Sequence, residues 1–185
     1  MSWHEVPRLL VTDFALLVVL LTCLFTDIKW KRIPNWITLP GMGLGLGLNT
    51  LLWGWAGLKQ SGLGLLVGFG LLFILFLLGW MGGGDVKLMG AVGAIGGFPF
   101  VVAALVYSIL VGAFIGFVVL IWKRELLRSL KNIFLYMLSR VLRFMPKHEL
   151  TEAAMHKIPF GIAIVIGVVW ARAMSWFADP LWMFR

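Results

Sequence analysis

Apolar segments of about twenty residues follow one another through most of the chain, and a helix of that length crosses the hydrocarbon core of a bilayer. The chain is 61% hydrophobic and 13% charged, and its mean hydropathy is +0.98, which is unlike a soluble domain. Its 185 residues leave room for roughly six spans and for no sizeable soluble domain. We therefore predict an all-α, polytopic integral membrane protein that forms a single membrane-embedded domain over residues 1–185.

The expected spans cover residues 9–26, 34–55, 62–80, 100–122 and 158–177, with a shorter helix over residues 86–97. We read the first apolar stretch as a retained span, because it shows no small-residue cleavage signal. A short outer loop that holds Lys59 is expected between the second and third spans. Pro34 is expected to begin the second span at a tight corner, since proline suits the first turn of a helix.

Basic residues predict how these spans are oriented. Twelve of the 16 Lys and Arg residues lie in segments assigned to the cytoplasmic side, where the positive-inside rule places them. The predicted topology is N-out and C-out. The net charge of +8 is thereby explained without nucleic acid, which we do not expect as a partner. The twelve residues are Lys29, Lys31, Arg32, Lys87, Lys123, Arg124, Arg128, Lys131, Arg140, Arg143, Lys147 and Lys157.

Four glycines in the second span are expected to let another helix pack closely. They lie four residues apart in the pairs Gly41 with Gly45 and Gly43 with Gly47, as in small-xxx-small faces.

The helix over residues 86–97 is too short to cross the membrane, because about eleven residues rise only about 16 Å. The sequence Gly96-Gly97-Phe98-Pro99 is expected to end it. Either its turn lies within the membrane, or its Asp85 end is drawn below the cytoplasmic surface. Both arrangements predict a notch beside Asp85 that water can reach.

Residues 123–157 form the one long polar stretch. Apolar residues recur in it at helical spacing between basic ones, which favours an amphipathic helix in the cytoplasmic interface that contacts anionic lipids. A solvated basic loop is the alternative.

Two aspartates, Asp27 and Asp85, are predicted to emerge on the same, cytoplasmic side. Two carboxylates close together share a proton, so that one can activate water while the other protonates the carbonyl and the leaving group. Peptide hydrolysis is the reaction that such a pair serves best. In the alternative, each aspartate only pairs with a nearby lysine such as Lys29 or Lys87.

Other candidate groups are assigned structural roles. Asp13 lies about 21 Å up the first helix from Asp27, so it cannot join the pair and is expected to be an interfacial or helix-packing residue. Cys23 is expected to pack in the apolar core. Because His4, His148 and His156 have no ligand spacing, no metal and no cofactor is predicted.

Three blocks of the sequence resemble a known family. Gly82-Gly83-Gly84-Asp85-Val86-Lys87-Leu88 fits the Gly-x-Gly-Asp-x-Lys-Leu block of the type IV prepilin leader peptidases, which are membrane aspartyl proteases. Asp27-Ile28-Lys29-Trp30-Lys31-Arg32-Ile33-Pro34-Asn35 resembles their first aspartate block, and Lys157-Ile158-Pro159-Phe160-Gly161 resembles their last-helix motif.

The resemblance implies that Asp27 and Asp85 are the catalytic pair of a hydrolase that cuts the leader from prepilins or pseudopilins. It implies a bacterial inner-membrane enzyme with its site facing the cytoplasm. The glycines Gly82 and Gly84 would shape the backbone that faces the substrate, and Lys87 would position or neutralise Asp85. The other implied supporting residues are Lys29, Ile33, Pro34 and Asn35.

The chain is most similar to the short, peptidase-only form found with tight-adherence (Flp-type) pili, because it has one cysteine and no paired Cys-x-x-Cys motifs. N-methylation of the product is therefore not predicted. Two alternatives remain: another Gly-x-Gly-Asp intramembrane protease, or a non-catalytic or transport protein whose carboxylates handle protons or ions.

Overall fold

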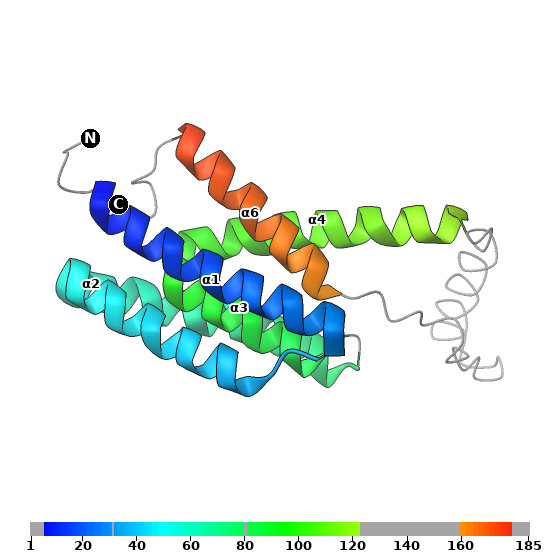
Figure 1. Cartoon of the computed structure of the whole chain (residues 1–185), viewed down its shortest axis with the longest axis horizontal. Helices are drawn as coiled ribbons and strands as arrows, with labels where there is room; N and C mark the ends of the chain where they lie inside the picture. The colour runs from blue at the N-terminus through cyan, green and yellow to red at the C-terminus, as the bar shows by residue number, and fades with distance from the viewer. Residues whose placement is uncertain (1–5, 31, 80, 123–159, 179–185) are drawn as a thin grey trace, which may run out of the picture. The chain divides into compact units, whose positions relative to one another are not determined.

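The structure is a computed structural model that describes residues 6–30, 32–79, 81–122 and 160–178 (Figure 1). The basic segment 123–157, with its predicted amphipathic helix, lies outside these residues. The chain divides into two compact units, Met1–Val111 with Pro159–Arg185 and Gly112–Ile158. The helices in the described part are α1 (Val6–Trp30), α2 (Asn35–Leu77), α3 (Gly83–Gly96), α4 (Phe98–Trp122) and α6 (Phe160–Ala178).

Three of these helices are long and apolar enough to cross a membrane, namely Leu9–Trp30, Asn35–Leu77 and Phe98–Trp122. The predicted all-α membrane class is therefore confirmed for the described residues. The helix ends differ by a few residues from the expected ones. In particular, α1 continues to Trp30, so that Asp27 lies inside its last turns and not after the helix. The residues after Asp27 contain no helix breaker until Pro34, which disfavours helical geometry in the residue before it.

The chain reverses within α2 at Gly54, whose φ of 61° and ψ of −140° are not helical. A single glycine can make this turn because it tolerates positive φ without steric cost. The predicted outer loop around Lys59 is therefore wrong, since the helix resumes directly after Gly54 and includes Lys59. We call residues 35–53 the first arm of α2 and residues 55–77 its second arm.

The first arm packs on α3 through one of the two predicted glycine faces. A Cβ at Gly41 would lie 3.5 Å from the Cβ of Ala91, and a Cβ at Gly45 would lie 2.6 Å from the carbonyl carbon of Ala94. These contacts confirm the predicted close packing for this pair. Gly43 and Gly47, in contrast, have no atom within 4 Å of a built Cβ and are exposed.

The second arm packs on α3 even more closely. A Cβ at Gly64 would overlap the carbonyl oxygen of Gly93, and a Cβ at Gly93 would overlap that of Gly64. Farther along the arm, a Cβ at Gly68 would lie 2.5 Å from the carbonyl oxygen of Met89. Along the first arm, successive glycines contact residues nearer the C-terminal end of α3, and along the second arm they contact residues nearer its N-terminal end. The two arms therefore run antiparallel against α3.

The short helix α3 is the centre of this unit, and every residue from Leu88 to Gly96 is buried. It contacts α1, both arms of α2, and α6. The predicted break after it is confirmed, because Gly97 ends the helix with a φ of 81° and α4 begins at Phe98. Its 14 residues rise about 21 Å, less than the thickness of a hydrocarbon core.

Side chains of α2 satisfy the carbonyl groups at the buried end of α3. The Nδ2 atom of Asn49 donates to the carbonyl oxygens of Ala94 and Ile95, each at 3.0 Å. The hydroxyl of Ser61 also donates to the carbonyl oxygen of Ala94. The last carbonyls of a helix have no partner within the helix, and leaving them unpaired in an apolar place is costly. Asn49 and Ser61 therefore allow α3 to stop inside the protein.

We expect Asn49→Leu to lower the free energy of unfolding by about 2 kcal/mol, because it leaves buried carbonyl groups without a donor. Thr50→Val is the matched control, because the Thr50 hydroxyl donates to Leu46 of its own helix and to no other group in the described part of the chain. This substitution should cost less than about 0.5 kcal/mol. The measurement is the unfolding of the purified protein in detergent. Equal stability of the two variants would show that Asn49 does not cap α3.

Candidate active site

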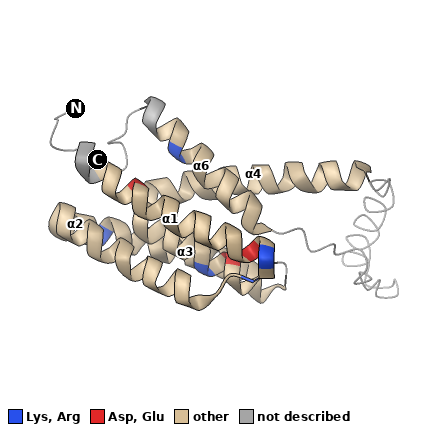
Figure 2. Cartoon of the chain, viewed as in Figure 1, with Lys and Arg blue, Asp and Glu red and all other residues tan. Residues whose placement is uncertain are grey.

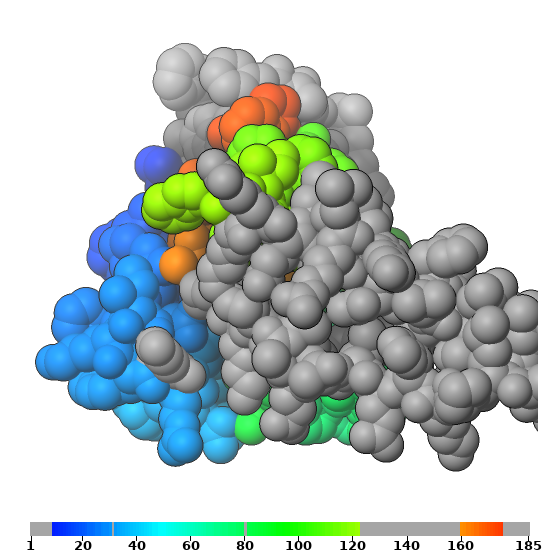
Figure 3. Space-filling model, turned by 90° about the vertical axis from the view of Figure 1, so that its right-hand side faces the viewer, coloured from blue at the N-terminus to red at the C-terminus, as the bar shows by residue number. Residues whose placement is uncertain are grey.

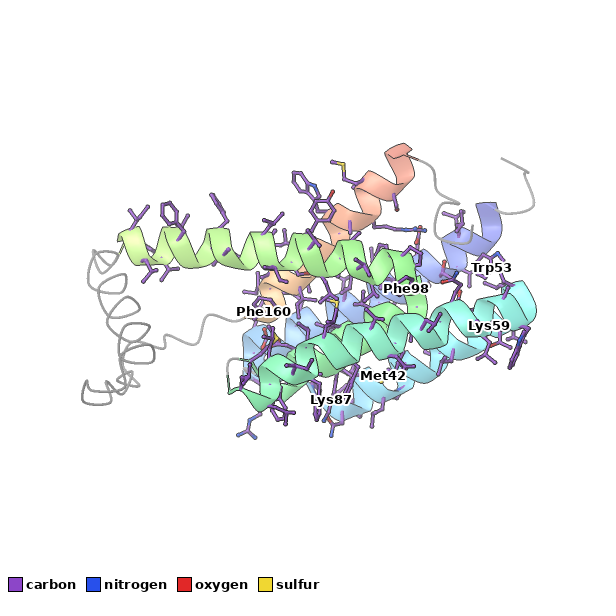
Figure 4. All side chains as sticks on the ribbon, turned by 180° about the vertical axis from the view of Figure 1, so that it is seen from behind. Met42, Trp53, Lys59, Lys87, Phe98 and Phe160 are labelled. Carbon is purple, nitrogen blue, oxygen red and sulfur yellow. The ribbon has the colours of Figure 1, made fainter. Side chains whose placement is uncertain are left out.

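Four helix ends meet at one end of the first unit and bring the candidate residues together. Asp27 lies near the end of α1, Asn35 begins α2, Asp85 lies in the first turn of α3, and Gly161 lies in the first turn of α6. In Figure 2, acidic positions of α1 and α3 lie at this same end. Figure 4 shows Lys87 and Phe160 at this end, with Trp53 and Lys59 at the opposite one.

Asp27 and Asp85 are close enough for their charges to interact. Burial raises the pKa of Asp85, the charge of Asp27 adds to this rise, and a hydrogen bond from the Gly82 backbone opposes both effects, so that the net pKa is about 6. Both aspartates are half-buried. Figure 3 views this end, and residues around the connection between α1 and α2 (blue) form part of the surface.

The nearby lysines contact other groups. Lys29 lies 5.5 Å from the ring of Phe25 and 5.3 Å from that of Trp30, while Lys87 donates a hydrogen bond of 2.8 Å to Oδ1 of Asn35. Among the described residues, neither aspartate forms an ion pair with a lysine, in contrast to the alternative in which each is only a partner of Lys29 or Lys87. Within the described ranges, the two carboxyl groups are therefore not neutralised by an ion pair.

Gly161 lies directly against Asp27, although it was not among the predicted site residues. A Cβ at Gly161 would overlap Oδ2 of Asp27, so only glycine fits here while the aspartate keeps its present position. The same Oδ2 atom is buried and has no hydrogen-bond partner within the part of the chain that the structure describes. The Pro-Phe-Gly sequence at residues 159–161 was the signal that could have identified it.

The remaining predicted residues support the start of α2 and of α3. Gly82 precedes α3, and a Cβ there would lie 3.3 Å from Oδ2 of Asp85. A Cβ at Gly84 would lie 3.0 Å from the Cβ of Ile33, which permits the α1–α2 connection to approach α3 closely. Pro34 precedes the first residue of α2 in an extended conformation, as its ring and position favour. Whether these residues face a substrate stays a prediction.

Asp13 lies away from this pair, in an ion pair of 2.5 Å with Arg172 of α6. Its predicted role in helix packing is confirmed. Within the described ranges, no three His, Cys, Asp or Glu side chains are grouped so that they could hold a metal ion. The titratable groups that the structure brings together at this end include the carboxyl groups of Asp27 and Asp85, both of them partly exposed.

The raised pKa of Asp85 predicts how stability depends on pH. Its ordinary pKa of 3.8 becomes about 6 in the folded protein, so the folded state binds the proton more tightly than the unfolded state. Its contribution to stability is full below pH 3.8 and is lost as the pH rises through 6, by on the order of 3 kcal/mol. We expect the melting temperature to rise as the pH falls from 7 to 5.

Asp85→Asn is expected to flatten this pH dependence and to raise the melting temperature at pH 7, because the amide carries no charge to bury. Thermal unfolding of both proteins in detergent across pH 5 to 7 measures it. An unchanged pH dependence in Asp85→Asn would assign the titration to another group.

Comparison with known proteins gives two matches. The model of the type IV leader peptidase family matches residues 14–117, which include both aspartates. The chain is also 34% identical over 125 residues to a prepilin leader peptidase/N-methyltransferase of Aeromonas hydrophila, an alignment that covers 62% of this chain and 40% of that protein. The chain thus spans well under half the length of this curated relative. No solved structure matches it.

Proposed function

We propose a function from one premise, namely that this chain belongs to the type IV leader peptidase family. It is a membrane-bound aspartyl endopeptidase that removes the leader peptide from type IV prepilins or pseudopilins of the Flp-like class. Asp27 and Asp85 are its catalytic residues. The observation that carries this proposal is the pair itself: two interacting carboxyl groups from α1 and α3, half-exposed and without a lysine partner among the described residues.

The proposed mechanism uses one proton shared by the pair, because two adjacent carboxylates cannot both ionise cheaply. The ionised carboxylate accepts a proton from a water molecule, whose oxygen attacks the carbonyl carbon of the scissile peptide. The protonated carboxyl donates its proton to the carbonyl oxygen. Collapse of the tetrahedral intermediate then breaks the C–N bond. The amine leaves with a proton from the pair, and a hydroxyl group of the intermediate returns its proton to the pair, which restores the single shared proton. The pair titrates as a unit, so its two apparent pKa values belong to both groups.

The proposed topology has about six spans with both termini outside. The two arms of α2, residues 35–53 and 55–77, reverse at Gly54, and each is about 30 Å long, which suffices for a crossing. The site then faces the cytoplasm of a bacterial inner membrane, since Lys29 and Lys87 lie at its end and the positive-inside rule applies. Anionic lipids contact the basic residues of this side.

The supporting residues hold the helix ends together in this proposal. The hydrogen bond from Lys87 to Asn35 ties the first turn of α3 to the first turn of α2. Lys87 thereby acts on Asp85 through the position of α3 and not through an ion pair. Gly82 and Gly84 place no side chain beside Asp85, which leaves room for an extended prepilin segment.

The test is the mobility on a gel of a prepilin that is co-expressed with this chain. We expect the wild-type chain to convert the prepilin to a shorter product, and Asp85→Asn to leave it full-length while reaching the same level in the membrane. Processing by Asp85→Asn at the wild-type rate would overturn the proposal. In that case proton flux in proteoliposomes tests the transport alternative, and cleavage of helices without a prepilin leader tests another intramembrane protease.

A further inference from the structure

The helices α1 and α6 contact each other at two places that lie far apart along both helices. Near the site, Gly161 of α6 lies against the carboxyl group of Asp27. Asp13, about 21 Å back along α1, forms an ion pair with Arg172, about 17 Å onward along α6. The two helices therefore run antiparallel, and these two contacts lie near the ends of their shared length.

The ion pair lies where four helices meet. The side chain of Arg172 is 13% exposed and that of Asp13 is 24% exposed. The guanidinium also lies 5.9 Å from the ring of Phe100 and donates to the hydroxyl of Ser175. Beside the pair is a small cavity lined by residues of α1, α3, α4 and α6, namely Thr12, Asp13, Leu16, Ile95, Gly96, Phe100 and Arg172. Separating two charges in such surroundings is costly, so the ion pair opposes any shift of α6 along α1.

Between the two contacts, α6 is also packed closely against α4. A Cβ at Gly167 would overlap the backbone of Ser108, whose hydroxyl donates to the carbonyl oxygen of Ile164 at 3.5 Å. The segment from Arg172 to Gly161 is therefore supported along its length and can transmit a displacement from one end to the other.

We propose that the ion pair of Asp13 and Arg172 is a positioning pair for the catalytic reaction, which fixes α6 along α1 so that Gly161 lies over the carboxyl group of Asp27. A slide of α6 by the rise of one residue, about 1.5 Å, carries Gly161 away from its present place against the carboxyl group of Asp27. Oδ2 of Asp27, which Gly161 covers, would then be displaced relative to Asp85. The proposal rests on the proposed function, because it assigns Asp27 to the reaction.

The test measures kcat and KM for a purified prepilin, with all proteins reconstituted in liposomes. Asp13→Asn and Arg172→Gln are each expected to lower kcat by about 10-fold, the size of a typical coupling between contacting residues, with KM changed by less than about 2-fold. The exchanged variant, Asp13→Arg with Arg172→Asp, is expected to recover kcat to within about 3-fold of the wild type. The exchange keeps the net charge at this end of the helices, so the orientation in the membrane is not altered.

Gly161→Ala tests the other end of the same contact and does not depend on the ion pair. We expect kcat to fall by about 100-fold, because a displacement of about 1 Å in a reacting group has effects of that size. Gly47→Ala is the matched control and should keep wild-type kcat, since no atom lies within 4 Å of its Cβ.

The outcomes separate the two proposals. If Asp85→Asn is inactive while Gly161→Ala and both ion-pair variants keep wild-type kcat, the positioning role is wrong and the peptidase function stands. Loss of thermal stability without loss of kcat in the folded fraction also overturns the positioning role. If Asp85→Asn cleaves the prepilin as the wild type does, the proposed function itself fails.

Discussion

Asp27→Asn and Asp85→Asn are each expected to lower kcat/KM for prepilin cleavage by about 10³-fold or more, and the double variant is expected to be no more than about 3-fold worse than either single one. The reason is that the shared proton belongs to the pair. An amide can neither accept the proton of the attacking water nor share a proton with its neighbour, so removing one member disables both.

The measurement is the initial rate of cleavage in liposomes, scaled to the amount of folded enzyme. Asp179→Asn makes the same chemical change outside both aspartate blocks, so it is the control and is expected to keep the rate within about 2-fold of the wild type. If the losses of the two single variants multiply in the double variant, the aspartates act independently and the shared-proton mechanism is wrong.

Gly64→Ala and Gly93→Ala are each expected to lower the free energy of unfolding by about 3 kcal/mol, the largest effect on stability that we expect. Each added methyl group would overlap the carbonyl oxygen of the other residue. Because the obstructing atoms belong to the backbone of a packed helix, relief requires α3 and the second arm of α2 to separate, and such overpacking is costly.

Gly43→Ala and Gly47→Ala are the matched controls, because both residues are helical and have open space around the added atom. They should leave stability unchanged or raise it by less than about 1 kcal/mol, since alanine favours a helix more than glycine does. Unfolding by a denaturing detergent measures all four variants. Similar stabilities in the two pairs would show that the close contact between α2 and α3 is not required for folding.

Much of the local structure follows from the sequence. Long apolar runs predict membrane helices, and the Gly96-Gly97-Phe98-Pro99 sequence predicts the end of the short helix, because these signals act within a few residues. The predicted loop at Lys59 was wrong for a local reason as well. One glycine at position 54, with positive φ, reverses the chain without a loop.

The sequence by itself determined the all-α membrane class, the two aspartate blocks and the short helix that follows Asp85. Only the tertiary structure decided that Gly41 and Gly45 pack on α3 while Gly43 and Gly47 do not, that Lys87 bonds to Asn35, that Arg172 pairs with Asp13, and that Gly161 covers Asp27. The physical reason is that composition and periodicity depend on neighbours in the chain. Which residues meet depends on how each helix is rotated and shifted against the others, and small residues four apart allow several such arrangements.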